Sequence, residues 1–236
     1  DGRPGVSVLL FAFDAEKVGE RLVERVGQAV LTCPTTACFD GLPDSPERVS
    51  VGGRLRHFGD RYQSSKLLEG RRYWRIPVME GEFLVEESFG VQKAIGGGNI
   101  LILAEDADAA LGAAEAAVAA MRRIRGVVLP FPGGVVRSGS KVGAKHYKEM
   151  IASTNDAYCP TLRGRKGVES ELPEGVGSVL EIVVNGLDRG AIESALREGI
   201  RAACRPGVVE ISAGNYGGRL GKHHFRLHDL LAEEMR

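Results

Sequence analysis

Apolar positions in the second half of the chain follow a pattern that occurs twice. Each copy runs from an apolar strand through a segment of helical spacing to a Gly-Val-Val strand and a glycine-rich turn, first over residues 99–134 and then over residues 180–215. When the two Gly-Val-Val strands are aligned without a gap, Ile100 falls opposite Glu181. The alignment therefore predicts a carboxylate where the sister copy has an apolar side chain. Such a charge costs free energy unless it is paired, solvated or used in chemistry.

Each copy is predicted to be a strand–helix–strand unit, and two such units side by side make a ferredoxin-like α/β sandwich. The Ala-rich segment Ala107–Met121 is predicted as a helix whose short side chains allow close packing on a sheet. Near the N-terminus, the apolar run Val6–Phe13 and the helical spacing of Ala15–Val30 repeat the strand–helix order. We therefore expect an α/β (α+β) fold with two ferredoxin-like α/β-sandwich lobes.

The composition changes around residues 80–82, which predicts a boundary between the two lobes. We expect an N-terminal (distal) lobe over residues 1–76 and a C-terminal (proximal) lobe over residues 77–236 that holds the duplicated unit. The chain opens with DGRPG and not with Met, so the N-terminal lobe could be incomplete. A polar, glycine-rich segment, Thr161–Gly177, is predicted to be a surface loop.

Composition argues against several classes of protein. Lys plus Arg and Asp plus Glu each number 31, and a net charge of zero argues against a nucleic-acid-binding protein. No apolar run is long enough to span a bilayer and no signal peptide opens the chain, so we expect a soluble, cytoplasmic protein. The 4 cysteines form no CxxC pair, which argues against structural zinc and against a disulfide scaffold.

Three further motifs are weighed against simpler structural roles. Residues 96–99 (GGGN) precede a strand, whereas a dinucleotide-binding fingerprint follows one, so the Rossmann interpretation fails. GVVRSGSK, which ends at Lys141, resembles a phosphate-binding loop but lacks a strand-to-helix context, so a solvated turn is favoured over an anion-binding loop. His223, His224 and His228 have no nearby carboxylate or cysteine at ligand spacing, so packing or an intersubunit contact is favoured over metal binding.

Glu181 lies in the segment SVLEIVV, where alternation places it on one face of a strand with Val179 and Val183. Two interpretations are equally supported at this point. The carboxylate could reach solvent or a salt bridge at a strand edge. Alternatively, the site could be dry, in which case desolvation raises the carboxyl pKa towards neutrality and suits the group to proton transfer.

Seven segments resemble one family, in order and at matching spacing. They read EGEFLVEESFG, AIGGGN, AEDADAALGAAEAAV, PFPGGVVRSGSKVGAKHY, ASTNDAYCPT, ELPEGVGSVLEIVVNGL and ISAGNYGGRLGKH. The chain is similar in these segments to the formylmethanofuran–tetrahydromethanopterin N-formyltransferases. The resemblance covers essentially the whole chain and is strongest from Glu80 onward, and members of the family extend further before DGRPG.

The resemblance implies reversible transfer of a formyl group between the amine of methanofuran and N5 of tetrahydromethanopterin, in methanogenesis or in bacterial formaldehyde oxidation. It implies no metal and no prosthetic group, with methanofuran and tetrahydromethanopterin as co-substrates. It also implies a homo-oligomer (dimer or tetramer) with active-site clefts between subunits, and bacterial relatives act within a formyltransferase/hydrolase complex. The competing hypothesis is a non-catalytic scaffold subunit of such a complex, against which the retained Glu181 argues.

The catalytic glutamate of the family falls in the motif EIVVNG, so the resemblance assigns that role to Glu181. One carboxyl poised near neutrality could take the proton from the incoming nitrogen and return it to the departing one. Polar residues in the matching loops are candidates for substrate binding, although each could equally cap a turn. They are Ser140, Lys141, Asn155, Asp156, Asn185 and Asn215, with Phe131 and Tyr216 as aromatic candidates for pterin contacts.

Overall fold

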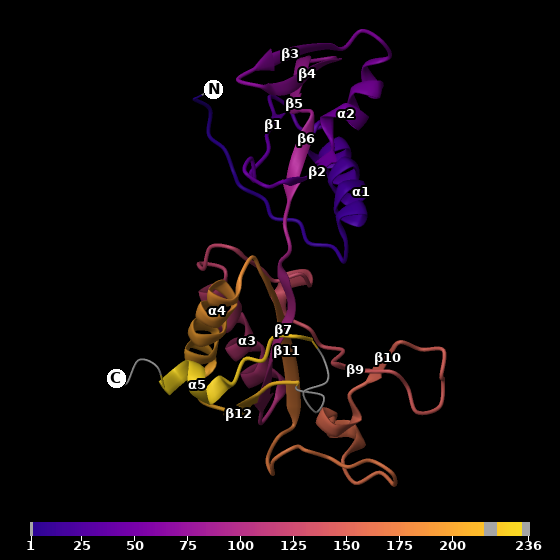
Figure 1. Ribbon diagram of the computed structural model, residues 1–236. Helices are drawn as coiled ribbons and strands as arrows, with labels where there is room; N and C mark the ends of the chain where they lie inside the picture. Colours follow the sequence, from indigo (N-terminus) through magenta and orange to yellow (C-terminus); the bar gives the residue numbers. More distant parts are fainter. Residues whose placement is uncertain (1, 215–220, 233–236) are drawn as a thin grey trace. The chain divides into compact units, whose positions relative to one another are not determined.

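The computed structural model describes residues 2–214 and 221–232 of the chain (Figure 1). By its internal contacts the chain divides into two compact units, Asp1–Lys93 and Ala94–Arg236. Each unit combines strands with helices, which confirms the expected α/β fold in two lobes. The boundary expected after residue 76 falls inside strand β4 (Arg71–Val78), which pairs with the strand that follows it, β5 (Gly81–Glu86).

The first unit is built on a four-stranded sheet in the order β1-β5-β4-β3, beside a two-stranded ribbon of β2 and β6. Its helix α1 begins where the Asp14 side chain accepts a hydrogen bond of 2.8 Å from the backbone N–H of Lys17. The core lies around Val51, Ile76 and Phe83. In chain order the elements are α1 (Ala15–Arg25), a π-helical turn (Val26–Val30), β1 (Ala37–Cys38), β2 (Glu47–Ser50), α2 (Gly52–Leu55), a 3-10 turn (Arg56–Gly59), β3 (Ser64–Leu68), β4, β5 and β6 (Ser88–Val91).

The strand predicted over Val6–Phe13 is wrong. This segment has no strand assignment, and the side chains of Val6 and Phe13 are 91% and 100% exposed. An apolar run becomes a strand only when a neighbouring strand takes up its backbone N–H and C=O groups. None of the strands in the described part of the chain pairs with residues 6–13. Local hydrophobicity alone therefore overstated the order of this segment.

The second unit contains an antiparallel four-stranded sheet in the order β12-β7-β11-β8, with helices α3 and α4 on one face (Figure 1). This is the strand order of a ferredoxin-like sandwich made of two strand–helix–strand units, as expected for this lobe. In chain order the elements are β7 (Ile95–Ala104), α3 (Ala107–Met121), β8 (Val127–Val128), a 3-10 turn (Pro132–Gly134), β9 (Ser140–Val142), β10 (Ala152–Thr154), 3-10 turns (Asp156–Tyr158 and Pro160–Leu162), β11 (Ser178–Gly186), α4 (Arg189–Ala203), β12 (Val208–Ser212) and α5 (Leu227–Ala232).

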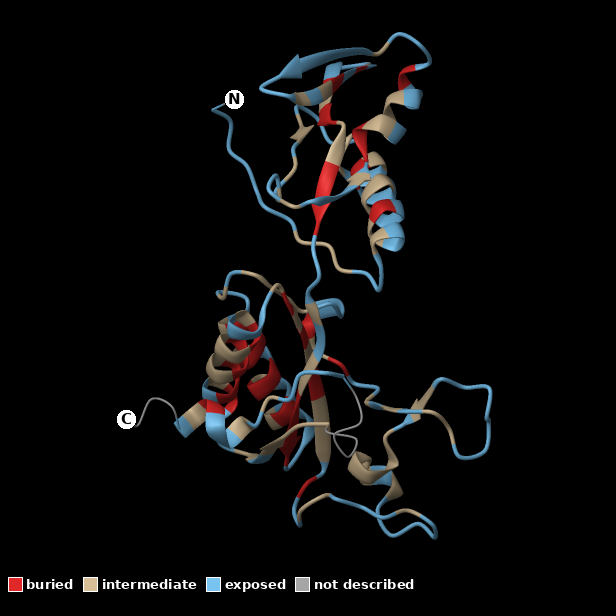
Figure 2. Cartoon of the chain, viewed as in Figure 1, coloured by how far each residue is buried: buried red, intermediate tan, exposed pale blue. Residues whose placement is uncertain are grey.

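The two faces of this sheet have different coverings. Figure 2 shows that the buried residues of α3 and α4 lie on the sides of the helices that face the sheet. Strand residues Ile100 and Ile182 point into this helix-covered core and are fully buried. Leu101 and Leu103 of β7 form a separate apolar cluster on the opposite face. Within the described part of the chain, no helix combines the length and the apolar character of a transmembrane span.

The gap-free alignment of the two copies is wrong by one residue in the strand and helix. Both helices begin at an aspartate cap, Asp106 for α3 and Asp188 for α4, and each aspartate accepts a hydrogen bond from the backbone N–H three residues later. Gly126 comes five residues after the end of α3, but Gly207 comes only four residues after the end of α4. Aligning the glycines therefore shifts everything before them by one position.

The corrected register changes which residue is equivalent to Glu181. In the structure Ile100 pairs directly with Ile182, and Glu181 pairs directly with Leu101. Directly paired residues lie on the same face of a sheet, so Ile100 and Glu181 lie on opposite faces. With the helix caps aligned, the residue equivalent to Glu181 is Asn99. The sister copy thus carries a polar side chain at this position, contrary to the prediction.

Candidate functional site

The candidate site lies on the face of the second unit's sheet that is opposite α3 and α4. Three residues form a row across it, because Leu101 of β7 pairs with Glu181 of β11 on one side and with Ser212 of β12 on the other. The segment after β10 covers part of this face, since Tyr158 and Val176 pack on the cluster that includes Leu101. The loop predicted over Thr161–Gly177 thus contributes packing to the sheet as well as exposed residues.

Glu181 is buried at one end of this row, beside Leu101, with only 8% of its surface exposed. Its backbone is bridged to Val136, whose N–H donates to the Glu181 carbonyl at 2.7 Å while the Glu181 N–H donates back at 2.9 Å. Its side-chain Oε1 accepts a hydrogen bond of 2.9 Å from Asn99 Nδ2. None of the ion pairs between described residues involves Glu181. The geometry therefore favours a desolvated carboxyl over a strand-edge carboxylate in solvent.

The environment of Glu181 changes its acidity. Burial disfavours the charged carboxylate and raises the pKa of Glu181 above the ordinary glutamate value, and the hydrogen bond from Asn99 opposes this increase in part. The carboxyl therefore keeps its proton to higher pH than a solvated glutamate does. The direction of this shift is the one that suits a carboxyl to proton transfer.

Asn99 is a residue of this site that the sequence patterns do not single out. In the sequence it ends the glycine-rich motif GGGN, which does not fit a dinucleotide-binding loop. Its side chain bridges Glu181 to the backbone of Gly214, whose N–H donates to Asn99 Oδ1 at 3.1 Å. The signal was present in the helix caps, because aligning Asp106 with Asp188 places Asn99 opposite Glu181.

Four of the predicted binding residues lie together at the β9–β10 ribbon. Ser140 pairs with Thr154, Lys141 pairs with Ser153, and Asn155 and Asp156 follow the end of β10 directly. The side chain of Lys141 forms an ion pair with Asp156. The sequence did not single out Lys145, whose Nζ lies 2.7 Å from the other carboxylate oxygen of Asp156.

The Asp156 carboxylate is held in its charged form by this arrangement. Hydrogen bonds from Lys141 and then Lys145 bring the pKa of Asp156 well below its ordinary range. Two lysines around one aspartate leave one unit of positive charge at the ribbon. A positively charged cluster of this kind could bind an anionic part of a ligand. The side chain of Lys145 is exposed to solvent and therefore accessible to such a ligand.

The other predicted contacts are placed separately. The Oδ1 atom of Asn185 in β11 accepts a hydrogen bond of 2.9 Å from the Gly97 N–H. This bond to the backbone is a structural role, like the turn capping that was the alternative to substrate binding. Phe131 is exposed at the start of the 3-10 turn. Asn215 and Tyr216 lie outside the described residues.

Tyr158 is a third residue that the sequence patterns do not single out, after Asn99 and Lys145. Its hydroxyl donates a hydrogen bond of 2.6 Å to Glu171, and the residue packs against the cluster of Leu101, Leu103 and Val176. Burial, followed by the hydrogen bond to Glu171, raises the pKa of Tyr158 to about 12. The phenol therefore stays protonated at physiological pH. It anchors the covering segment to the sheet next to the row that contains Glu181.

Two family models match this chain, one over each part of it. The family model described as "FTR, proximal lobe" matches residues 81–230, and the model described as "Formylmethanofuran-tetrahydromethanopterin formyltransferase" matches residues 1–78. The chain belongs to the formylmethanofuran–tetrahydromethanopterin formyltransferase family. This membership confirms the resemblance seen in the sequence motifs. The two matches also meet close to the composition change, within the β4–β5 hairpin.

Similar proteins of this family come from both bacteria and archaea. Relatives named formylmethanofuran–tetrahydromethanopterin formyltransferase are 54% identical in Methylobacillus flagellatus and 52% identical in Methanopyrus kandleri. Each alignment covers 98% of this chain, with 78% and 77% of the respective relative. The solved formyltransferase of Methanosarcina barkeri has a TM-score of 0.86 at 47% identity, covering 93% of this chain and 74% of that one.

A second solved structure is a formyltransferase/hydrolase complex from Methylorubrum extorquens in complex with methylofuran. The matching chain has a TM-score of 0.86 at 50% identity, covering 93% of this chain and 73% of that one. A similar protein from the same organism is named as a subunit of the formyltransferase/hydrolase complex and is 52% identical over 98% of this chain.

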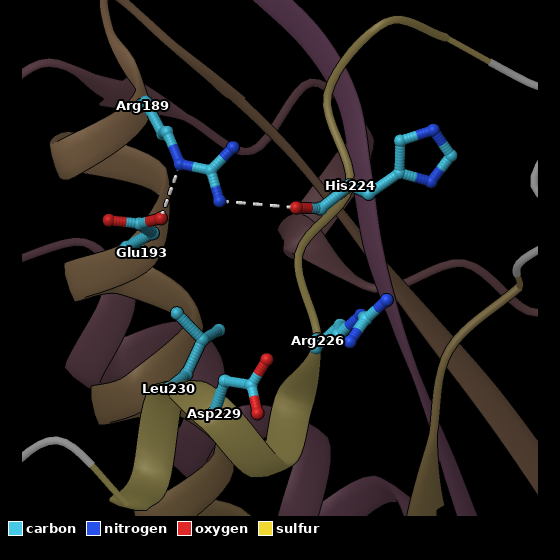
Figure 3. A pocket seen from close by; sticks show the side chains of 6 residues that line it. All are labelled: Arg189, Glu193, His224, Arg226, Asp229 and Leu230. Atoms are coloured by element: carbon cyan, nitrogen blue, oxygen red, sulfur yellow. Dashed lines mark hydrogen bonds and ion pairs between the residues drawn. The ribbon is translucent and has the colours of Figure 1, made fainter.

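Other parts of the second unit offer less to a formyl-transfer reaction. A pocket of about 270 Å³ lies between α4 and α5. In Figure 3, Arg189 at its rim donates to Glu193 at 2.6 Å and to the backbone carbonyl of His224 at 3.2 Å, while the His224 imidazole points away. Helix α4 packs on the other face of the sheet from Glu181. Over the described ranges, no group of three or more His, Cys, Asp or Glu residues could hold a metal ion.

The raised pKa of Glu181 predicts a pH-dependent effect of Glu181→Gln on stability. Folding keeps the proton on Glu181 to higher pH than the unfolded chain does, so the contribution of this carboxyl is lost as the pH rises through the folded pKa. Glutamine keeps an oxygen for Asn99 but has no charge to desolvate. Urea unfolding should therefore show that the free energy of unfolding of the wild-type protein falls relative to that of Glu181→Gln as the pH rises. A difference that does not change with pH would contradict the desolvated carboxyl.

Proposed function

We propose that this chain transfers a formyl group between the amine nitrogen of methanofuran and N5 of tetrahydromethanopterin, in either direction, as a step of one-carbon metabolism. The observation that carries this proposal is the similarity to relatives of that name, at 52% to 55% identity over 98% of the chain. A buried glutamate with a raised pKa on one sheet face supports it. Methanofuran and tetrahydromethanopterin are then the co-substrates, and no prosthetic group is required by the chemistry.

The proposed chemistry is an acyl transfer that leaves the oxidation state of the formyl carbon unchanged. The lone pair of N5 attacks the formyl carbon, a tetrahedral intermediate forms, and the bond to the methanofuran nitrogen breaks. N5 loses one proton and the methanofuran nitrogen gains one. Glu181 can accept the first proton and donate the second, because its burial brings the pKa of the carboxyl closer to that of a general acid–base catalyst working near neutrality.

The charged ribbon of β9 and β10 is proposed to bind the methanofuran side of the reaction. Methanofuran carries carboxylates, and Lys141 and Lys145 share one aspartate, which leaves net positive charge. Ser140, Asn155 and Asp156 lie on the same ribbon and are proposed as further contacts. Asn185 and Asn215 remain proposed contacts on the strength of the family resemblance alone.

Removing the Lys141 charge should weaken methanofuran binding more than it slows turnover. Lys141→Ala is expected to raise the KM for formylmethanofuran about tenfold, which corresponds to ~1.4 kcal/mol, with little change in kcat. Steady-state kinetics with each co-substrate varied in turn measures this effect. Lys66→Ala, at an exposed lysine of β3 in the first unit, is the matched control and should change neither constant. A fall in kcat at unchanged KM would argue against a binding role.

The assembly is also proposed from the family. We infer a homo-oligomer, dimer or tetramer, whose active-site clefts lie between subunits, with other subunits of a formyltransferase/hydrolase complex as further partners. The complex from Methylorubrum extorquens supports the second part of this inference. The alternative is a non-catalytic scaffold subunit, and the retained Glu181 with its Asn99 contact argues against it.

A direct assay separates the enzyme from the scaffold. The purified full-length protein is mixed with formylmethanofuran and tetrahydromethanopterin, and release of methanofuran is followed over time. Transfer at a rate proportional to protein concentration supports the enzyme, provided that Glu181→Gln loses most of it. No transfer by the intact oligomer would favour the scaffold.

A further inference from the structure

Asn99 connects two distant parts of the second unit through its single carboxamide. Its Nδ2 donates to Glu181 Oε1 at 2.9 Å, across 82 residues of sequence. Its Oδ1 accepts from the Gly214 N–H at 3.1 Å, across 115 residues. The side chain thus joins strand β7 to strand β11 and to the segment that follows β12. Asn99 itself is half-buried, so both bonds are partly shielded from water.

The two contacts fix which way the carboxamide faces. The backbone N–H of Gly214 can only donate, so it must meet the carboxamide oxygen. The NH₂ group is then directed at Glu181, where it can only donate. A hydrogen-bond donor at this position binds the ionised carboxylate more strongly than the protonated carboxyl. When Glu181 is protonated, the oxygen that faces Asn99 must be the carbonyl oxygen, because only that oxygen lacks a proton. The proton of Glu181 is thereby restricted to Oε2.

The contact follows from the symmetry of the duplicated unit. The two copies are related across the directly paired residues Ile100 and Ile182. Asn99 and Glu181 are each one position away from this pair, on equivalent strands, and they are diagonal neighbours on the face opposite the helices. Equivalent positions in the two copies therefore carry a carboxamide and a carboxylate that meet near the symmetry axis. A chance surface contact would have no such constraint.

We propose that Asn99 is a positioning residue that holds the Glu181 carboxyl in one orientation and registers it against the Gly214 segment. This inference rests on the proposed formyl-transfer function and deepens it. In the reaction, the oxygen that does not face Asn99 exchanges the proton with the substrate nitrogens. Without Asn99 the carboxyl could rotate about its terminal torsion, and the Gly214 segment would lose its tie to the sheet.

Among the described residues, few charges compete with the effect of Asn99 on Glu181. On the same face of the sheet, Tyr158 interacts with Glu171 of the covering segment and with Glu210 of β12. Arg137 follows the bridging residue Val136, and at the β9–β10 ribbon Lys141 and Lys145 are bound by Asp156. Among the described residues, burial raises the pKa of Glu181 and the Asn99 hydrogen bond lowers it. Loss of Asn99 should therefore move the titration of Glu181 to higher pH.

The test compares Asn99→Ala and Asn99→Asp in the full-length protein. In Asn99→Ala we expect turnover to fall about 10²-fold, as a misplaced catalytic group does. The inflection of the pH–rate profile that Glu181→Gln removes should move to higher pH. Asn99→Asp should move it further, because a second carboxylate then faces Glu181 across the symmetry axis. Asp106→Ala, which removes the cap of α3 on the same strand–helix unit, is the control for a loss of stability alone.

Two readouts do not depend on activity. The Glu181 carboxyl is titrated by ¹³C NMR in glutamate-labelled protein, with the resonance identified from its absence in Glu181→Gln. Hydrogen exchange at the Gly214 amide is measured in parallel and should become faster in Asn99→Ala. Both changes together support the positioning role even before any rate is measured.

The proposal is overturned if Asn99→Ala loses no more activity than Asp106→Ala and titrates at the same pH as the unmodified protein. It is also overturned if the Gly214 amide exchanges at an unchanged rate. An active wild-type enzyme with these results would reject the role of Asn99 alone. An inactive wild-type protein would instead reject formyl transfer, and the NMR and exchange data would then decide whether Asn99 still controls the carboxyl.

Discussion

Glu181→Gln should lower the turnover of formyl transfer by about 10²- to 10⁴-fold, the range by which a positioned general acid–base catalyst accelerates a reaction. Glutamine is nearly isosteric, and its oxygen can still accept the hydrogen bond from Asn99 Nδ2. It cannot, however, accept a proton from N5 or return one to the methanofuran nitrogen. The loss should therefore appear in kcat, with the KM for both co-substrates changed by a small factor.

Steady-state kinetics at saturating co-substrates, together with circular dichroism of the folded variant, measures this effect. Glu82→Gln is the matched control, because it makes the same substitution at an exposed residue of β5 that pairs with Arg75 in the first unit. It should retain turnover within about twofold, as expected of an exposed ion pair. Near-normal turnover of Glu181→Gln in a folded oligomer would remove Glu181 from the mechanism. Equal losses in the two variants would point to a general effect of the substitution.

Leu196→Ala should destabilise the second unit by ~3–5 kcal/mol. Leu196 lies on α4 with only 1% of its surface exposed and belongs to the core shared by both helices and the sheet. Truncating a fully buried leucine removes its transfer free energy and leaves a cavity that the surroundings fill only in part. The residues that α3 contributes to this core are mainly alanines, such as Ala113, Ala114 and Ala117, which have no flexible side chain to move into the space.

The same substitution at an exposed leucine provides the control. Leu111 lies on α3 with 46% of its surface exposed, so Leu111→Ala should cost at most about 1 kcal/mol. Urea unfolding at one fixed protein concentration, followed by circular dichroism, gives both free energies. Equal effects at the two positions would contradict the packing of α3 and α4 described for this core.

Local patterns in the sequence predicted most of the second unit. Helical spacing located Ala107–Met121 at the bounds found in the structure. Alternation in SVLEIVV correctly placed Glu181 on the face opposite Ile182. These predictions succeeded because periodicity reports directly on which side of an element is buried. The family resemblance, carried by long motifs in order, was confirmed as well.

Two predictions failed for a shared reason. Val6–Phe13 has the composition of a strand but lacks a described strand partner, and the equivalence of Ile100 with Glu181 ignored a one-residue difference in the turn before Gly207. Both errors concern relations between segments, on which a local pattern carries no information. The aspartate caps of α3 and α4 were the better anchors, because a capping side chain marks the first turn of a helix.

The sequence by itself determined the duplicated strand–helix–strand units of the second lobe, the face on which Glu181 lies and the family to which the chain belongs. Each of these depends on neighbouring residues or on motifs that can be compared position by position. Only the tertiary structure decided that the Glu181 carboxyl is buried and that Asn99 donates a hydrogen bond to it. Burial arises because Glu181 of β11 is flanked by β7 on one side and by the bridging residue Val136 on the other, and the Asn99 bond joins residues 82 apart. The free energy that sets the acidity of Glu181 therefore comes from contacts made only once the chain has folded.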